Sequence, residues 1–228
     1  MSALDTSTSA ESVKVTITEA FPSRPLDEIR ESADRPLVLL FHGRGGDESR
    51  FVPWIPQLPP EYDVIRFRGP LAYEDGYTWA TPVTPGAATV PGVSYGDGAA
   101  AVEKWLDDNG LDTPDRDISV GGFSAGCILS FQLLERRPDR YTTVIGLSGC
   151  ISPENAVSPG RADSPTRVFW GIDPVGDDFL TSDRLDATRT WLSRFDTVEL
   201  HYPNTGHDIR AAEFADVVAF LKGSGSRP

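Results

Sequence analysis

Lysine is scarce in this 228-residue sequence, since only three of its 21 basic residues are lysines, against 34 acidic residues. The formal net charge is −13, which argues against nucleic acid as a partner, because that binding needs concentrated Lys and Arg. An acidic, lysine-poor composition is typical of proteins from a high-salt cytoplasm, where salt screens the self-repulsion of the chain. We therefore state a halophilic protein as a hypothesis, with an ordinary acidic protein as the alternative.

Long hydrophobic runs are also lacking. No stretch approaches the ~20 apolar residues of a membrane-spanning helix, and the N-terminus has no basic cluster followed by an apolar run, as a secretory signal would have. We expect a cytoplasmic protein with no transmembrane segment. The length suits one sizeable domain, predicted at residues 13–222, between disordered tails at 1–12 and 223–228.

Cysteine occurs only twice, as Cys127 and Cys150, each among apolar or small neighbours. Two thiols without a spacing pattern do not form a disulfide framework. We expect buried, inert thiols.

Short apolar or β-branched runs alternate with helical patterns along the chain. Strands are expected at residues 13–18, 37–41, 63–67, 118–123, 143–148, 167–170 and 198–202, and helices at 97–109, 124–137, 183–195 and 209–222. This alternation predicts the α/β class, with a mostly parallel, doubly wound sheet flanked by helices. The segment 68–95 fits neither pattern, and we interpret it as an irregular rim that faces the substrate.

The strongest motif is G-x-S-x-G at residues 122–126, with Ser124 at its centre. It follows a strand-like run at 118–121 and opens a helical pattern at 125–137. In this context the serine lies on a sharp turn as an exposed nucleophile, and the helix N-terminus favours developing negative charge. The alternative is a small-residue turn that packs a helix onto a sheet.

A second motif, HGRGG at residues 42–46, directly follows an apolar run. It lacks the G-K-[ST] ending of a phosphate-binding P-loop and the G-x-G-x-x-G spacing of a dinucleotide-binding loop. Its place ahead of the serine motif predicts an oxyanion loop, with the backbone N–H groups of Arg44 and Ala125 as the two donors. The Arg44 side chain either attracts an acidic substrate or pairs with Asp47 or Glu48, and the sequence leaves both open.

A nucleophilic serine needs a base, and the chain has three histidines. His42 belongs to the oxyanion loop and His201 lies inside an expected strand, so a structural role is favoured for both. His207 lies on a loop between the last expected strand and the last expected helix. This position suits the chain order Ser, Asp, His that accompanies a G-x-S-x-G turn in hydrolases. His207 is therefore the predicted base.

The acid that orients the base is expected on the loop after the strand at 167–170. Three aspartates compete there: Asp173, Asp177 and Asp178. The residues alone do not choose between them.

Taken together, these motifs resemble the phospholipase/carboxylesterase family of α/β hydrolases, which includes acyl-protein thioesterases and bacterial carboxylesterases. The resemblance covers roughly residues 36–221 and is carried by LVLLFHGRGGDE, FRGPLAYEDGYTWA, GGFSAGC, VIGLSGC, RVFWGIDPVGDDF and YPNTGHDI. It implies an α/β-hydrolase fold and an enzyme without a cofactor or a metal that acts on carboxylic or thio esters.

The family pattern implies Asp177 as the acid, because alignment of the following helix puts that residue at the acid position. Two departures from the pattern are visible. Ala125 stands where the family commonly has Gln, and the acid loop is longer and contains its own D-P match at Asp173. Asp173 and Asp178 therefore remain alternatives.

The expected activity is cleavage of carboxylic esters through a Ser-His-Asp triad and an acyl-enzyme intermediate. The alternatives are an acyl-thioesterase or (lyso)phospholipase on the same fold, and a non-catalytic hydrolase-fold binding protein. Trp79 and Tyr77, with Trp54 and Tyr73, either line an acyl groove or pack in the core or rim. The partner is then a small-molecule or acyl ester, and a homodimer is an expectation that the sequence leaves open.

Overall fold

One seven-stranded sheet organises the chain, of which the computed structural model describes residues 15–82, 92–152 and 164–223. The strand order is β1-β3-β2-β6-β7-β8-β9, and every neighbouring pair is parallel except β1 with β3. The strands are β1 (Ala20–Pro22), β2 (Leu37–Phe41), β3 (Asp63–Phe67), β6 (Ile118–Phe123), β7 (Thr143–Leu147), β8 (Arg167–Ile172) and β9 (Asp196–His201). A separate hairpin pairs β4 (Leu71–Tyr73) with β5 (Gly76–Thr78). This sheet confirms the predicted α/β-hydrolase fold class.

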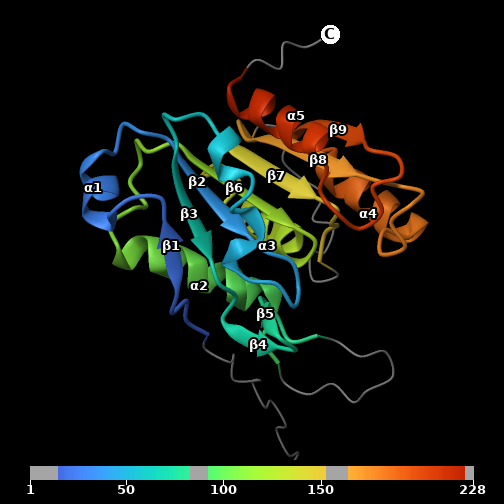
Figure 1. Cartoon of the computed structure of the whole chain (residues 1–228), viewed down its shortest axis with the longest axis horizontal. Helices are drawn as coiled ribbons and strands as arrows, with labels where there is room; N and C mark the ends of the chain where they lie inside the picture. The colour runs from blue at the N-terminus through green and yellow to red at the C-terminus, as the bar shows by residue number, and fades with distance from the viewer. Residues whose placement is uncertain (1–14, 83–91, 153–163, 224–228) are drawn as a thin grey trace, which may run out of the picture.

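Helices cover both faces of the sheet (Figure 1). They are α1 (Leu26–Glu31), α2 (Tyr95–Asp108), α3 (Ala125–Arg136), α4 (Ser182–Leu192) and α5 (Ala211–Leu221), with short 3-10 turns η1 (Glu48–Phe51) and η2 (Ile55–Gln57). The buried residues of α2, α3 and α4 pack against one face of the sheet, and those of α5 and η1 pack against the other. Since parallel strands are buried on both faces, they read as continuous apolar runs in the sequence.

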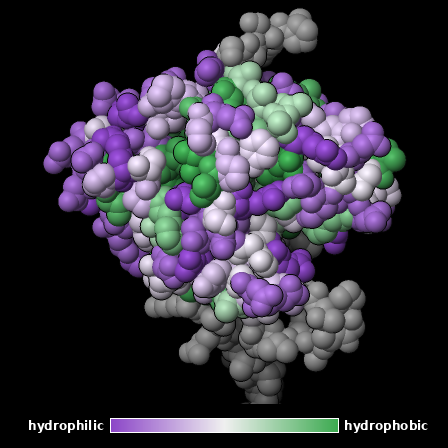
Figure 2. All heavy atoms as spheres, in the orientation of Figure 1, coloured by the Kyte–Doolittle hydropathy of each residue, from purple (hydrophilic) through white to green (hydrophobic). Residues whose placement is uncertain are grey.

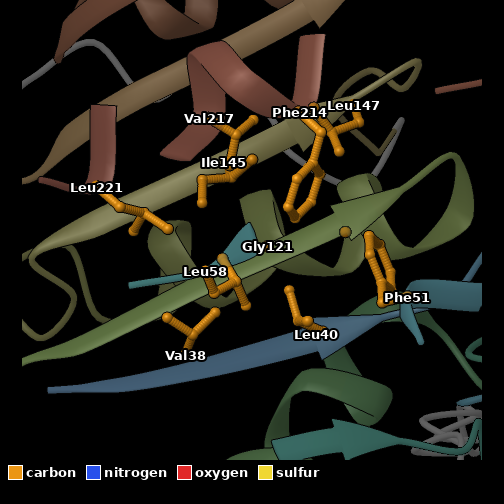
Figure 3. Close-up of a pocket in the computed structure, with 11 residues that line it drawn as sticks. Val38, Leu40, Phe51, Leu58, Gly121, Ile145, Leu147, Phe214, Val217 and Leu221 are labelled. Atoms are coloured by element: carbon orange, nitrogen blue, oxygen red, sulfur yellow. The ribbon is translucent and has the colours of Figure 1, made fainter. Parts of the chain in front are cut away.

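Alternation along β2 shows how one run supplies both cores. Leu37, Leu39 and Phe41 belong to the cluster under α2 and α3, while Val38 and Leu40 belong to the cluster under α5. Figure 3 shows the second cluster, where apolar side chains of α5 and of the strands point into the space between them. Every residue lining that space is apolar or glycine, as expected for a helix packed on a sheet.

Several expectations from the sequence need correction. The described residues 15–18 are not a strand, and the first strand is the antiparallel edge strand β1. The segment 68–95 is not irregular throughout, because it holds the hairpin β4–β5 and the first residue of α2. Helix α1 is not among the predicted helices. The two tails predicted to be disordered lie almost wholly outside the described residues.

Both cysteines are free and buried, as expected. Burial raises the pKa of the Cys150 thiol to about 11, and burial also raises the pKa of Cys127 well above its usual value. Neither thiol is therefore a reactive thiolate near neutral pH.

Hydrophilic residues cover most of the face seen in Figure 2, with hydrophobic residues in patches between them. The exposed large hydrophobic side chains of the described residues are Val52, Val175 and Val198. Scattered apolar side chains of this kind do not require a partner, so a homodimer stays a prediction. None of the helices in the described part of the chain is both long and apolar enough to span a bilayer.

Candidate active site

Ser124 lies on the sharp turn between β6 and α3, with φ of 55° and ψ of −113°. The turn demands glycine on both sides: a Cβ on Gly122 would lie 2.2 Å from the backbone of Gly126, and a Cβ on Gly126 would lie 2.0 Å from the carbonyl oxygen of Phe41. The Ser124 N–H donates to the Leu147 carbonyl at 2.9 Å and anchors the turn to β7. A positive φ at a non-glycine residue is strained, and such strain clusters at functional sites.

The Ser124 hydroxyl is in hydrogen-bond contact with a histidine from the other end of the chain. Nε2 of His207 lies 2.8 Å from Oγ of Ser124, and Nδ1 of His207 lies 2.8 Å from Oδ2 of Asp177. The His207 side chain is 37% exposed, whereas that of Asp177 is fully buried. The second carboxylate oxygen of Asp177 accepts from the N–H of Phe179 at 2.9 Å, which fixes its orientation. The structure thus brings together the three residues assigned to the predicted triad.

Asp173, the main alternative for the acid, has a different environment. Its buried carboxylate accepts from four backbone N–H groups, those of Val175, Gly176, Thr205 and Gly206. Burial raises the pKa of Asp173, but these N–H groups outweigh that effect and hold it below its usual value. Asp173 therefore ties the acid loop to the histidine loop, while Asp178 is exposed on the surface.

The HGRGG loop is held by the hairpin β4–β5. The N–H of Gly45 donates to the Tyr77 carbonyl at 2.9 Å, and the N–H of Tyr77 donates to the Gly46 carbonyl at 2.9 Å. Within residues 15–82, 92–152 and 164–223, the N–H groups of Arg44 and Ala125 donate no hydrogen bond to the protein. The loop lies beside the turn, because a Cβ on Gly43 would be 3.4 Å from Cβ of Ser124. These two donors remain the predicted oxyanion hole.

His42 is buried and has a structural environment, as expected. Its Nε2 accepts from the N–H of Gly69 at 2.9 Å, so the proton lies on Nδ1, which donates to the Gly43 carbonyl at 2.7 Å. Burial lowers the pKa of His42 and keeps it neutral. His201 lies on β9, where its Nε2 is 2.7 Å from a carboxylate oxygen of Glu199 in an exposed contact.

Trp79 does not line an open groove, and its predicted place in substrate binding needs correction. Its side chain is fully buried, packs edge-on against Phe41, and donates from Nε1 to the His42 carbonyl at 2.8 Å. The indole thus supports the oxyanion loop from the core. Trp54 likewise packs, stacking on Phe214 of α5.

Tyr77 is partly exposed beneath the Arg68 guanidinium, whose carbon lies 4.8 Å from the ring centroid. Its role in substrate binding stays a prediction. The expected partners of Arg44 are occupied elsewhere, since Asp47 accepts from Ser49 and Glu48 pairs with Arg68. The Arg44 guanidinium lies instead 5.9 Å from the Tyr73 ring centroid.

Sequence reasoning missed the two phenylalanines that flank His207. The Phe123 ring centroid lies 5.1 Å from that of His207, and the Phe179 ring centroid lies 5.2 Å from it on another element. Phe123 is the x of the G-x-S-x-G motif, and Phe179 follows the acid loop. The sequence shows that both residues neighbour the predicted site motifs. It does not predict their contact with the imidazole, because that contact depends on how the loops pack together.

The sequence pattern that defines the phospholipase/carboxylesterase family matches residues 98–224, more than half of the chain. The chain belongs to the phospholipase/carboxylesterase family. No curated protein sequence matches it.

Solved structures with this fold include carboxylesterases and an acyl-protein thioesterase. A carboxylesterase from Mesorhizobium loti is 24% identical, with a TM-score of 0.65 over 83% of this chain and 89% of that one. A Bacillus cereus carboxylesterase is 15% identical, with a TM-score of 0.71 over 90% and 94%. Zea mays acyl-protein thioesterase 2 is 18% identical, with a TM-score of 0.65 over 90% and 98%. At these identities the likeness supports the shared fold.

Proposed function

We propose that this member of the phospholipase/carboxylesterase family is a serine hydrolase that cleaves carboxylic esters through Ser124, His207 and Asp177. The observation that carries the proposal is the unbroken hydrogen-bond chain from the serine hydroxyl through both ring nitrogens to a buried carboxylate. A serine hydroxyl is weak until a neighbouring base takes its proton, and an imidazole is a good base when its tautomer is fixed.

In the proposed reaction, Nε2 of His207 removes the proton as Oγ of Ser124 attacks the ester carbonyl. Asp177 holds the proton on Nδ1 and stabilises the imidazolium. The N–H groups of Arg44 and Ala125 hold the oxyanion, and each such donor is worth about 3 kcal/mol. His207 then protonates the leaving alcohol, and water releases the acid by the reverse steps. Each catalytic group named in this cycle is a side chain or backbone N–H of this chain, and water is the second reactant.

Labelling by a fluorophosphonate tests the proposal, because the reagent reacts with an activated serine. We expect labelling of the wild type and none of Ser124→Ala, with both proteins folded by circular dichroism. Absence of labelling in the folded wild type, at low and at molar KCl, would favour a non-catalytic binding protein.

An acyl-thioesterase is the second candidate, and the fold shared with the maize acyl-protein thioesterase supports it. Comparison of p-nitrophenyl esters of increasing acyl length with the matching acyl-thioesters separates the two. A kcat/KM that is higher for thioesters at every chain length would replace the esterase proposal.

A further inference from the structure

The imidazole of His207 is flanked by two pairs of side chains, each an aromatic ring capped by a guanidinium. The Arg50 guanidinium carbon lies 4.4 Å from the Phe123 ring centroid, and the Arg184 guanidinium carbon lies 4.4 Å from the Phe179 ring centroid. Both phenylalanine rings contact His207. Two arginines therefore lie one ring away from the predicted base.

The two arginines differ in how their charge is balanced. Arg50 pairs with Asp208 at 2.5 Å, so its charge is largely compensated. Arg184, at the start of α4, is exposed, and its Nη1 donates to the neutral carbonyl of Phe179 at 2.7 Å. Among the described residues, no carboxylate lies within ion-pair distance of Arg184, although Asp178 and Asp183 are its exposed neighbours in the chain.

Arg44 supplies a second charge of the same kind on the oxyanion loop. Its side chain is exposed and lies over Tyr73, and no ion pair joins it to the described part of the chain. The turn of the hairpin β4–β5 brings Glu74 near this loop, since a Cβ on Gly45 would lie 3.6 Å from Oε2 of Glu74. That carboxylate reduces the local positive charge without forming a bridge.

The net charge of −13 would repel an anion at long range, so the local arginines must be weighed against it. At physiological ionic strength the screening length is about 8 Å, and charges farther away act weakly. A guanidinium that contacts a carboxylate forms short charge-assisted hydrogen bonds that screening reduces much less. Direct contact with an exposed arginine therefore affects the binding of an anion more strongly than the screened net charge of the rest of the chain does.

We propose that the site selects esters that carry a carboxylate near the scissile bond, with Arg184 as the main contact and Arg44 as the second. This inference rests on the ester hydrolase proposed above. It accounts for two exposed guanidinium groups that have no carboxylate partner among the described residues, in a chain in which acidic residues far outnumber basic ones. Arg184 lies over the ring of Phe179, which contacts His207, and Arg44 lies on the loop beside Ser124. In this assignment Arg50 stays with Asp208 and holds Phe123 against His207.

Two matched ester pairs test the selectivity. Methylation removes the charge on the leaving group in the pair 4-acetoxybenzoate and methyl 4-acetoxybenzoate, and the charge on the acyl group in the pair mono-4-nitrophenyl adipate and its methyl ester. Release of the phenol is followed in every case, because methylation also adds a second ester bond. For at least one pair we expect kcat/KM of the wild type to be about tenfold higher for the anion at the lowest KCl that maintains the fold. Rising KCl should shrink that ratio.

Variants assign the effect to the proposed contact. Arg184→Gln should lower the anion-to-neutral ratio several-fold, mainly through KM, and Arg184→Lys should restore part of it. Lys104→Gln removes one positive charge from an exposed side chain on α2, paired with Asp108, and should leave the ratio unchanged.

The controls separate the two proposals. Equal turnover of the anionic and neutral members of both pairs by a wild type that labels with fluorophosphonate would overturn the selectivity and leave the hydrolase intact. An Arg184→Gln ratio equal to that of wild type would also overturn it. No turnover and no labelling would instead remove the proposed function on which the inference rests.

Discussion

The carboxylate of Asp177 and Nδ1 of His207 meet at 2.8 Å, although they lie on different loops of the sheet edge. Because Asp177 is buried and held by the Phe179 N–H, it can fix the imidazole tautomer. We expect Asp177→Asn to lower kcat/KM about 10⁴-fold, since an amide favours the wrong tautomer. Asp178→Asn makes the same change on an exposed carboxylate and should stay near wild type. Activity of Asp177→Asn within tenfold of wild type would exclude it as the acid.

Asp173 should matter for stability more than for chemistry, because it joins the two loops through four N–H groups. We expect Asp173→Asn to lower the free energy of unfolding by about 2 kcal/mol near neutral pH. The pKa of this carboxyl is held below its usual value, so its contribution is present above the unfolded pKa and disappears as the pH falls through the folded pKa. Urea unfolding should show the two proteins converging in acid, below about pH 4. An unchanged difference across that range would contradict this account.

The hairpin β4–β5 should control the oxyanion loop through a close backbone approach. A Cβ on Gly76 would lie 2.3 Å from the Gly45 carbonyl oxygen, so Gly76→Ala must displace the loop or the hairpin. We expect kcat/KM to fall about 100-fold, the effect of losing one oxyanion donor. Gly92→Ala is a control, because its Cβ would meet the Thr81 side chain at 2.8 Å, away from that loop. Similar losses of activity in both variants would point to a general packing defect.

Glu213 should make stability depend on pH. This buried carboxyl lies in the first turn of α5, and among the described residues its Oε1 has no hydrogen-bond partner. Burial raises its pKa to about 7 from an ordinary 4.5. The folded protein therefore holds a proton that the unfolded chain has lost, and this contribution to stability is lost as pH rises from about 4.5 through 7.

Replacing this carboxyl should remove that loss. We expect Glu213→Gln to be more stable than wild type by about 2 kcal/mol at pH 8 and no more stable near pH 5. Thermal unfolding across this range measures the difference, and Asp107→Asn, an exposed carboxylate on α2, serves as the charge control. A constant difference between Glu213→Gln and wild type at all pH values would show that the carboxyl does not titrate there.

The charge composition predicts a response to salt. If the acidic, lysine-poor surface is adapted to high salt, the melting temperature and turnover of a neutral ester should both rise as KCl increases to molar levels, because screening relieves self-repulsion. Loss of fold or activity over the same range would support an ordinary acidic protein.

The sequence by itself predicted most strands and helices in their order along the chain, and it predicted the two loops that carry Ser124 and His207. The apolar run of β2 predicted that strand because a strand buried on both faces needs continuous hydrophobic residues, and the glycines around Ser124 are required by a turn with no room for a Cβ. The alternation of strands and helices was likewise sufficient to predict the fold class. These features are local, so the chain encodes them within a few residues.

Only the tertiary structure separates the environments of the three aspartates, because these depend on where a loop at 173–178 meets a loop at 204–208. Asp173 accepts backbone N–H groups and Asp177 faces the imidazole. The residues alone left the acid open, and only the resemblance to the family favoured Asp177. The same holds for Trp79, whose aromatic character suggested a groove although its neighbours bury it. The contact of Arg50 with Phe123, and those of Phe123 and Phe179 with His207, also form only through folding, since they join residues far apart in the chain.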